Sequence, residues 1–487
     1  MKIFNKGESP SWWVSLIPFI FLIATLVVVI KVFGAGALDG ASQVSLLFAT
    51  GVIVMISMLF YGKKWHDLEN SILDNVRSVG AAIIILLLIG SVAGSWMVSG
   101  IVPTMIYYGM KVILPSIFLF ATCGICALIS VMTGSSWTTI ATVGVALVGI
   151  GTSQGYDPGW TAGAIISGAY FGDKISPLSD TTVLASSSSG TPLFTHIRNM
   201  MITTVPSFVI AMIVFLVVSL THEMPDSLQV ADFSHDLATT FNISPWLLLV
   251  PVFTGVLIVK KVPAILTLFA ASVMAGIAAF IAQPHIIGAV ATGCTPDPQQ
   301  TLSFLDGFKG IFMSYYGATA VDTGNAVLND LVATRGMTGM LYTVFLIISA
   351  VTFGGALVGS GMLQSLTDVL TRFIRRRVTM VASTVGTGIF TNMITGDQYL
   401  SIILTSSLYK KLYQERGYDS KLLSRSVEDS ATVVSVLIPW NSCGMTQATV
   451  LNVSTLTYLP YCIFNVVSPL MSIFVAMIGY KIVRQSK

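Results

Sequence analysis

Charged side chains are scarce in this sequence. They make up 10% of its 487 residues, and hydrophobic residues make up 54%, whereas a soluble domain averages about 25% charged residues. This composition excludes an ordinary soluble domain. It predicts an all-α polytopic membrane protein in contact with the lipid bilayer, with about ten spans of roughly 20 residues each. The net charge of +3 is too small and too dispersed to indicate nucleic-acid binding.

Cysteine and histidine are also rare, with five of each. Cys123 and Cys126 have CxxC spacing, but no second pair and no histidine cluster accompanies them, so neither a disulfide framework nor a metal motif is predicted. The glycines of GVALVGIG (144–151) lack the lysine of a phosphate-binding loop. No serine or aspartate comes with a recognisable partner base. We therefore expect neither an enzyme nor a cofactor.

Several loops lack lysine and arginine altogether, namely 34–43, 152–159, 222–244 and 454–457. Other loops and both ends of the chain are basic, including the cluster Arg372, Arg375, Arg376 and Arg377. Positive residues stay on the cytoplasmic side of a membrane. We expect both termini in the cytoplasm and 222–244 as an acidic external loop. The first apolar run, 14–33, is expected to be an uncleaved span, although AGA (35–37) leaves signal-peptide cleavage as an alternative.

Charges interrupt one apolar run at GDKISPLSDTT (172–182). Ionisable groups at membrane depth persist mainly where they pair, face a cavity or serve a function. Ser176-Pro177 favours the start of a second half-helix, because serine caps free amides and proline fits the first helical position. The pattern predicts a broken helix over 160–188 that unwinds near Gly172 and restarts at Pro177, with Asp180 in its first turn.

Sequence features recur about 262 residues apart. Gly134 of TGSSW corresponds to Gly396 of TGDQY, and Pro177 corresponds to Pro439, both at an offset of 262 (396 − 134 and 439 − 177). Each half contains a double run with a polar glycine tip, at 113–151 and 378–413, which we interpret as a re-entrant hairpin. Each also contains a broken helix, at 160–188 and 424–453. We expect a first repeat at 1–221 and a second at 245–487, with five full spans each, so that the second copy is inverted. Inverted repeats with broken helices are typical of alternating-access carriers.

The polar residues at membrane depth fall on the two hairpin tips and the two broken helices. Hydroxyl, amide and carboxylate oxygens suit a hard cation such as Na+. Asp180 and Asp397, with neighbouring hydroxyls and amides, are the expected Na+ ligands. The candidate ion- or substrate-binding residues are Ser135, Ser136, Thr138, Asp173, Lys174, Ser179, Asp180, Thr181, Asn392, Thr395, Asp397, Asn441 and Ser442.

Each of these residues also has a structural interpretation. Hydroxyls in membrane helices usually bond to the backbone or a neighbouring helix. Lys174 is expected to neutralise its neighbour Asp173, or else to face a substrate carboxylate. Glu428 and Asp429 either function at depth or lie near the cytoplasmic surface after Arg425.

Several long runs resemble the NhaC-type Na+/H+ antiporter family, within the ion-transporter superfamily of inverted-repeat carriers. They are IVPTMIYYGMKVILP (101–115), TGSSWTTIATVGVALVGIG (133–151), GAIISGAYFGDKISPLSDTTVLA (163–185), TNMITGDQY (391–399) and SRSVEDSATVVSVLIPWNSCG (424–444). The resemblance covers nearly the whole chain. It implies a bacterial inner-membrane carrier that exchanges Na+ for H+, and it makes a homodimer an expectation.

The predicted mechanism is competition for a shared carboxylate. A carboxylate removed from water favours its neutral form, so it holds either a proton or Na+, and mutual exclusion produces antiport. Asp180 is the main candidate, Asp397 the second, and Asp173 paired with Lys174 a modulator. Two alternatives stay open: an exchanger of organic acids such as malate and lactate, or of amino acids, coupled to Na+ or H+; and an ion channel.

Overall fold

The computed structural model describes residues 10–33, 40–177, 179–222, 227–260, 262–293, 302–321, 329, 332–371 and 376–480. Within these ranges the chain is helical and forms no β-strand, apart from an isolated bridge between Thr319 and Thr334. Seven described helices are long and apolar enough to cross a membrane, or up to ten if each sharply bent pair is one span. The protein is therefore a multi-pass, all-α membrane protein, as its composition predicts.

Some residues used in the topology prediction lie outside the described ranges. They include both basic ends of the chain (1–9 and 481–487), AGA (35–37), the acidic residues Glu223 and Asp226 of the predicted external loop, and the basic residues Arg372 and Arg375.

The helices follow the chain in two comparable series. The first half contains α1 (Trp12–Phe33), α2 (Ala41–Tyr61), α3 (Trp65–Ser78), α4 (Gly80–Val98), α5 (Ile101–Val112), η2 (Pro115–Ile117), α6 (Phe118–Thr133), α7 (Ser136–Thr139), the π-helix η3 (Ile140–Gly144), α8 (Val145–Ser153), α9 (Pro158–Ile175), α10 (Asp180–Ser189), α11 (Leu193–Thr221) and α12 (Ser227–Thr240).

The second half contains η4 (Pro245–Leu248), α13 (Leu249–Val259), α14 (Ala264–Ala282), α15 (Pro284–Thr292), α16 (Phe304–Tyr316), α18 (Gly336–Gly339), α19 (Leu341–Ser360), α20 (Met362–Thr371), α21 (Arg377–Thr395), α22 (Gln398–Glu415), α23 (Ser420–Val427), the π-helix η5 (Glu428–Thr432), η6 (Ser435–Leu437), α24 (Ser442–Leu451), α25 (Thr455–Tyr458), η7 (Leu459–Tyr461) and α26 (Ile463–Ile478).

Left-handed backbone positions between helices recur at a nearly constant spacing. They are Gly100 and Gly361 (φ 76° and 79°), Gly134 and Gly396 (67° and 65°), and Gly190 and Asn452 (76° and 53°). Glycine and, less readily, asparagine adopt this conformation. The spacing is 261 for the first pair (361 − 100) and 262 for the others (396 − 134 and 452 − 190). This recurrence agrees with duplication, while the inverted orientation of the second copy stays a prediction.

The break in the first broken helix lies further along the chain than the sequence predicts. Helix α9 continues through Gly172 to Ile175, and α10 begins at Asp180 rather than Pro177. Ser176 is extended, with ψ 130°, because a residue before proline is sterically kept from the α conformation. The cap of α10 is Ser179, whose hydroxyl accepts the amide of Thr182. The predicted unwinding at Gly172 and capping by Ser176 are therefore wrong.

Gly172 instead allows close helix packing. A Cβ on Gly168 or on Gly172 would collide with the backbone carbonyl oxygens of Cys123 and Ala127, respectively. These two glycines are four residues apart on α9, and together they let α6 lie directly against it, as small residues do between membrane helices. This packing holds the polar end of α9 next to the tip that follows α6.

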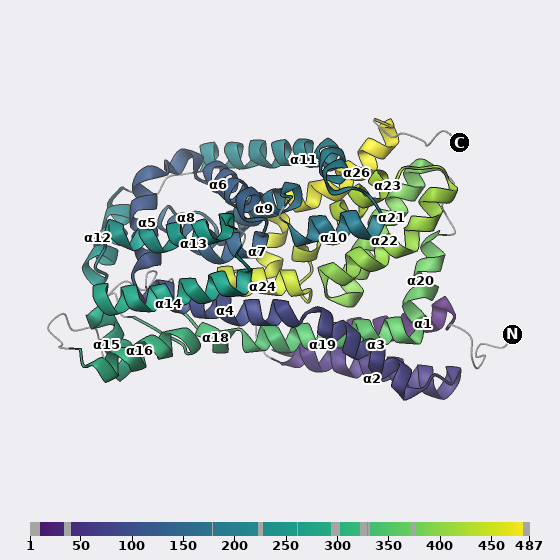
Figure 1. The fold of residues 1–487 in the computed structure, drawn as a ribbon, viewed down its shortest axis with the longest axis horizontal. Coiled ribbons are helices and arrows are strands. Elements are labelled where there is room, and N and C mark those ends of the chain that lie inside the picture. Colours follow the sequence, from purple (N-terminus) through teal and green to yellow (C-terminus); the bar gives the residue numbers. More distant parts are fainter. Residues whose placement is uncertain are drawn as a thin grey trace.

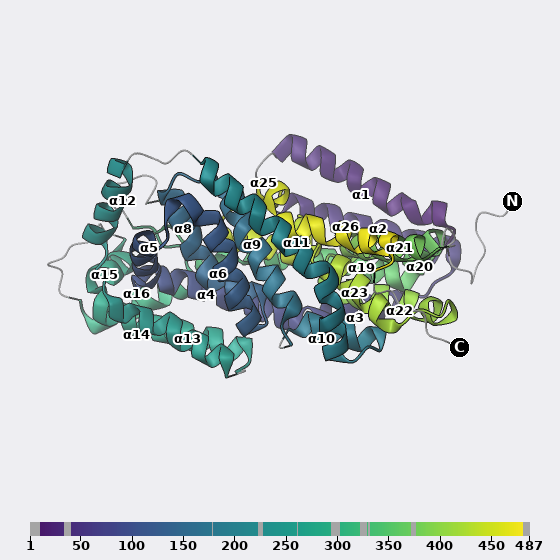
Figure 2. The same cartoon turned by 90° about the horizontal axis from the view of Figure 1, so that it is seen from above.

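Figure 1 shows an elongated molecule in which α7, α10 and α24 lie between α11 on one side and α4 and α19 on the other. Helix α1 runs along an outer edge beside α2 (Figure 2). The largest cluster of buried apolar side chains is drawn mainly from α4–α9 and α14, a second from α1, α2 and α19, and a third from α21–α23. The short half-helices are thus enclosed by longer ones.

Candidate functional site

Four half-helices begin at residues that the sequence singles out. The N-caps of α7, α10, α22 and α24 are Ser135, Ser179, Asp397 and Asn441. Each side chain accepts a backbone amide two or three residues ahead, at distances of 3.2, 3.3, 3.0 and 3.0 Å, respectively. Such caps satisfy amides that a helix start leaves free. These four residues therefore have a structural role whatever else they do.

Asp397 joins two of these helix starts. Its side chain is fully buried, with one oxygen capping α22 and the other accepting the Ser442 hydroxyl at 3.3 Å. The Ser442 amide donates to the carbonyl of Gly396 at 2.7 Å. The second hairpin tip is thus held against the start of α24, and a buried carboxylate lies at the junction.

Asp180 meets the same tip from the other half of the chain. The Tyr399 hydroxyl donates to its Oδ2 at 2.7 Å, and its Oδ1 accepts the Thr181 amide at 2.9 Å. The Asp180 carboxylate also interacts electrostatically with those of Asp173 and Asp397. Asp180 is exposed, however. The expectation of a desolvated aspartate is wrong for Asp180 and holds for the two buried aspartates beside it.

Asp173 faces the first hairpin tip. Its Oδ2 accepts both the amide and the hydroxyl of Ser136, at 3.1 and 2.6 Å. Its Oδ1 is buried and has no hydrogen-bond partner in the described part of the chain. The first tip and the end of α9 therefore form a second junction around a buried carboxylate.

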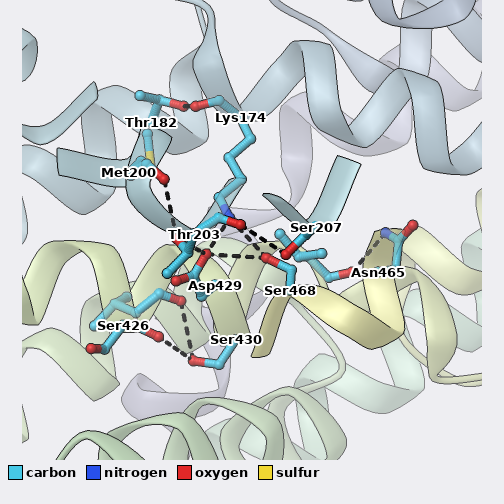
Figure 3. A network of polar contacts seen from close by, with 12 residues as sticks. Lys174, Thr182, Met200, Thr203, Ser207, Ser426, Asp429, Ser430, Asn465 and Ser468 are labelled. Atoms are coloured by element: carbon cyan, nitrogen blue, oxygen red, sulfur yellow. Dashed lines mark hydrogen bonds and ion pairs between the residues drawn. The ribbon is translucent and has the colours of Figure 1, made fainter. Parts of the chain in front are cut away.

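Lys174 does not neutralise Asp173. Its Nζ forms an ion pair with Asp429 and donates to the Ser468 hydroxyl at 2.9 Å (Figure 3). The Thr203 hydroxyl donates to the same Asp429 oxygen at 3.2 Å. Consecutive residues on a helix point in different directions, so Asp173 turns toward α7 while Lys174 turns toward η5 and α26. The predicted pairing is wrong for this reason.

The acids after Arg425 do not lie at a surface. Arg425, Glu428 and Asp429 are each 0% exposed. Ser468, Thr203 and Tyr399 are missing from the candidates derived from the sequence, and Asp429 is considered there only as one of two alternatives. The signal for Asp429 was present, since two acids followed by a mostly apolar run imply function at depth. The hydroxyls of Ser468 and Thr203 had no such signal.

The remaining candidates bond to residues next to them in the sequence or to the adjoining broken helix. Thr138 donates to Ser135 at 3.1 Å, Ser179 and Thr181 share a hydrogen bond of 2.9 Å, and Thr395 donates to the Asp397 carbonyl at 3.0 Å. The Asn392 amide donates to the carbonyl of Ala431 at 2.5 Å, and the Asn441 amide to the Asn392 side-chain oxygen at 3.2 Å. These bonds tie the tips to the broken helices.

The oxygen atoms at the two junctions suit one class of ion. The junctions present carboxylate and hydroxyl oxygens, which suit hard cations. In the part of the chain that the structure describes, no group of three or more histidines, cysteines, aspartates or glutamates could hold a metal ion.

Broken helices, hairpin tips and buried carboxylates within a multi-pass helical protein define a secondary membrane transporter. The Na+/H+ antiporter family matches residues 8–187 and again residues 168–480. The chain belongs to this family.

Curated relatives are similar in sequence to this chain over most of their length. The chain is 36% identical over 418 residues to the Na+/H+ antiporter NhaC of Alkalihalophilus pseudofirmus, covering 85% of this chain and 86% of that protein. It is 34% identical to the NhaC of Bacillus subtilis, covering 89% and 91%. It is also 34% identical to the malate-2H+/Na+-lactate antiporter of Bacillus subtilis, covering 85% of both chains.

Proposed function

We propose that this protein exchanges Na+ for H+ across the cell inner membrane by alternating access. The observation that carries the proposal is the contact between Asp180 and Tyr399, which lies two residues after Asp397. It brings the broken helix of the first half against the hairpin tip of the second half, with three carboxylates within electrostatic range. Family membership supports the same activity.

The carboxylates supply the coupling. A buried carboxylate without a compensating charge is unfavourable, so it takes up either a proton or a cation. Asp397 with Ser442, and Asp173 with Ser136, each offer carboxylate and hydroxyl oxygens to Na+. Asp180 is accessible and receives the ion first. When no ion is bound, the Tyr399 hydroxyl holds the Asp180 side chain in place. Proton and sodium exclude each other, so one leaves as the other enters.

The moving parts in this proposal are the hairpins and the broken helices. They shift against the longer helices and open the carboxylates to each side in turn. The repeat boundaries (1–221 and 245–487), the external loop 222–244, the inverted orientation, the re-entrant hairpins and the cytoplasmic termini belong to this proposal. A homodimer rests on family resemblance.

The test is dissipation of a pH gradient in everted vesicles on addition of Na+, Li+ or K+. We expect a response to Na+ that Asp180→Asn and Asp397→Asn each reduce by at least about tenfold, because an amide cannot exchange a proton. Asp74→Asn is the matched control, since this aspartate is exposed and pairs only with Arg77 on α3. Full exchange in Asp180→Asn and Asp397→Asn, or an uncoupled conductance typical of a channel, contradicts the proposal.

The second candidate is an exchanger of organic acids or amino acids coupled to Na+ or H+. One relative carries malate and lactate in its name, and the starts of α10, α22 and α24 converge, where helix amides favour anions. Lys174 is not free to receive a substrate carboxylate, because it pairs with Asp429. The same assay separates the two candidates: a response that requires malate, lactate or an amino acid favours this exchanger.

A further inference from the structure

One carboxylate outside the junctions is enclosed and accepts no hydrogen bond from the described residues. The side chain of Glu428 is 0% exposed, and neither of its oxygens has a hydrogen-bond partner among the described residues. Glu428 begins η5, a π-helical turn between α23 and η6. Such turns within helices occur frequently at functional sites.

The charges around Glu428 do not balance. Lys174 and Asp173 from α9 and Asp429 from its own turn interact with it electrostatically, and Arg425 lies one turn earlier on α23. All five side chains are buried. These five side chains are three acids and two cations. Lys174 forms an ion pair with Asp429, and Arg425 also interacts electrostatically with Asp429. An uncompensated buried charge is strongly unfavourable, so the group is neutral only when it binds one proton or one monovalent cation.

Other packed elements do not supply the missing charge near Glu428. Helix α11 packs against α23 and adds the exposed Arg198 and the buried His196, whose Nδ1 shares a hydrogen bond of 2.8 Å with the Ser424 hydroxyl. An enclosed imidazole close to Lys174 is unfavourable as a cation. On α21 the charged residue is Arg377, which donates to the carbonyl of Ala476 at the end of α26. Helix α22 carries Lys410, which donates to a carbonyl of α10, and an exposed pair of Lys411 with Glu415. Helix α10 adds the exposed Asp180, and α26 and η6 contain no charged residue.

We propose that Glu428 is a proton-binding site of the transport cycle, separate from the carboxylates that take Na+. The inference rests on the proposed Na+/H+ exchange and adds one more proton-binding residue to the carboxylates described there. Glu428 is a carboxylic acid in the enclosed state. When its side chain reaches water on one side, it releases one proton, and it takes one up again on the other side. Asp180 and Asp397 remain the carboxylates at which sodium and a proton compete.

The experiment uses the full chain in proteoliposomes and measures radioactive sodium in two ways. The first is uptake driven by a pH gradient, and the second is sodium-for-sodium exchange at equal pH, which needs no proton. We expect Glu428→Gln to reduce the first by at least about tenfold and to leave the second within about twofold of the unsubstituted protein. Glu415→Gln, at an exposed glutamate, is the matched control and should change neither.

Each other outcome is decisive. Normal gradient-driven uptake in Glu428→Gln overturns the proton site, and so does equal loss of both activities, because Glu428 would then serve the sodium site or the fold. If Glu428→Gln fails to insert into the membrane, the test is the pH profile of gradient-driven sodium uptake in Glu428→Asp. Retained uptake with a shifted pH profile supports the site, and an unchanged profile overturns it. Absence of gradient-driven uptake in the unsubstituted protein overturns the proposed exchange itself, and the proton site with it.

Discussion

Asp173 and Lys174 are neighbours in the sequence, yet they serve different parts of the molecule. Asp173 accepts two hydrogen bonds from Ser136 at the first hairpin tip, while Lys174 pairs with Asp429 on η5. Their divergence follows from the helix period, because α9 remains helical to Ile175. The ion pair therefore links the two halves of the chain and does not join two neighbours on one helix.

This buried pair predicts a specific pattern of stability. Lys174→Met alone should lower the free energy of unfolding by about 3–5 kcal/mol, because Asp429 is left as an unpaired buried charge. The double variant Lys174→Met with Asp429→Leu should recover most of that loss. Thermal unfolding of the purified protein in detergent measures both.

The exposed pair of Lys411 and Glu415 provides the control for this comparison. Its side chains are 87% and 59% exposed, so Lys411→Met should change the unfolding free energy by less than about 1 kcal/mol. A double variant as unstable as Lys174→Met alone would contradict the assignment, since the loss would then come from packing rather than from charge.

At the scale of helices, the two hairpin tips depend on glycine. Gly396 ends α21 with φ 65°, and Gly134 ends α6 with φ 67°. The residue after each glycine then caps the next helix, Asp397 for α22 and Ser135 for α7. The turn therefore places a candidate ligand at the start of a half-helix, and this placement was predictable from the local motifs.

Gly396→Ala should destabilise the protein by at least about 1–2 kcal/mol, because alanine resists this conformation. Its Cβ would also lie 2.5 Å from the Cβ of Ala350 on α19. Gly386 lies within the same helix with open space around it, so Gly386→Ala should be neutral or stabilising by up to about 1 kcal/mol. Thermal unfolding of the two variants checks this, and equal effects would mean that the left-handed turn is not required.

At the scale of the whole molecule, α1 begins and α26 ends at the same end of the elongated structure (Figure 1). This arrangement agrees with termini on one side of the membrane, as the basic loops predict. Which side that is remains a prediction from the distribution of lysine and arginine.

Cysteine labelling in intact cells tests the predicted sidedness. Ala238 lies in the lysine-free segment 222–244 and Gln414 lies beside Arg416, and both are exposed. With Cys294 replaced by serine, Ala238→Cys should react with an impermeant maleimide from outside, and Gln414→Cys should react only after the cells are opened. The other four cysteines are buried and provide the background control. The opposite pattern would invert the whole topology.

The sequence by itself determined the membrane class and the positions of the two glycine turns that separate the arms of each double run. These features depend on local properties: the length of apolar runs, the conformational freedom of glycine, and capping by serine, aspartate and asparagine. The family resemblance also followed from contiguous motifs.

Only the tertiary structure decided which charges meet. Lys174 and Asp429 are 255 residues apart, and Asp180 and Tyr399 are 219 apart. Which residues meet at such separations depends on how each helix is rotated and packed against its neighbours, which no local pattern specifies. For the same reason the sequence placed Asp180 in a desolvated site and left open whether the acids after Arg425 lie at depth or near a surface. The packed helices expose Asp180 and enclose Glu428.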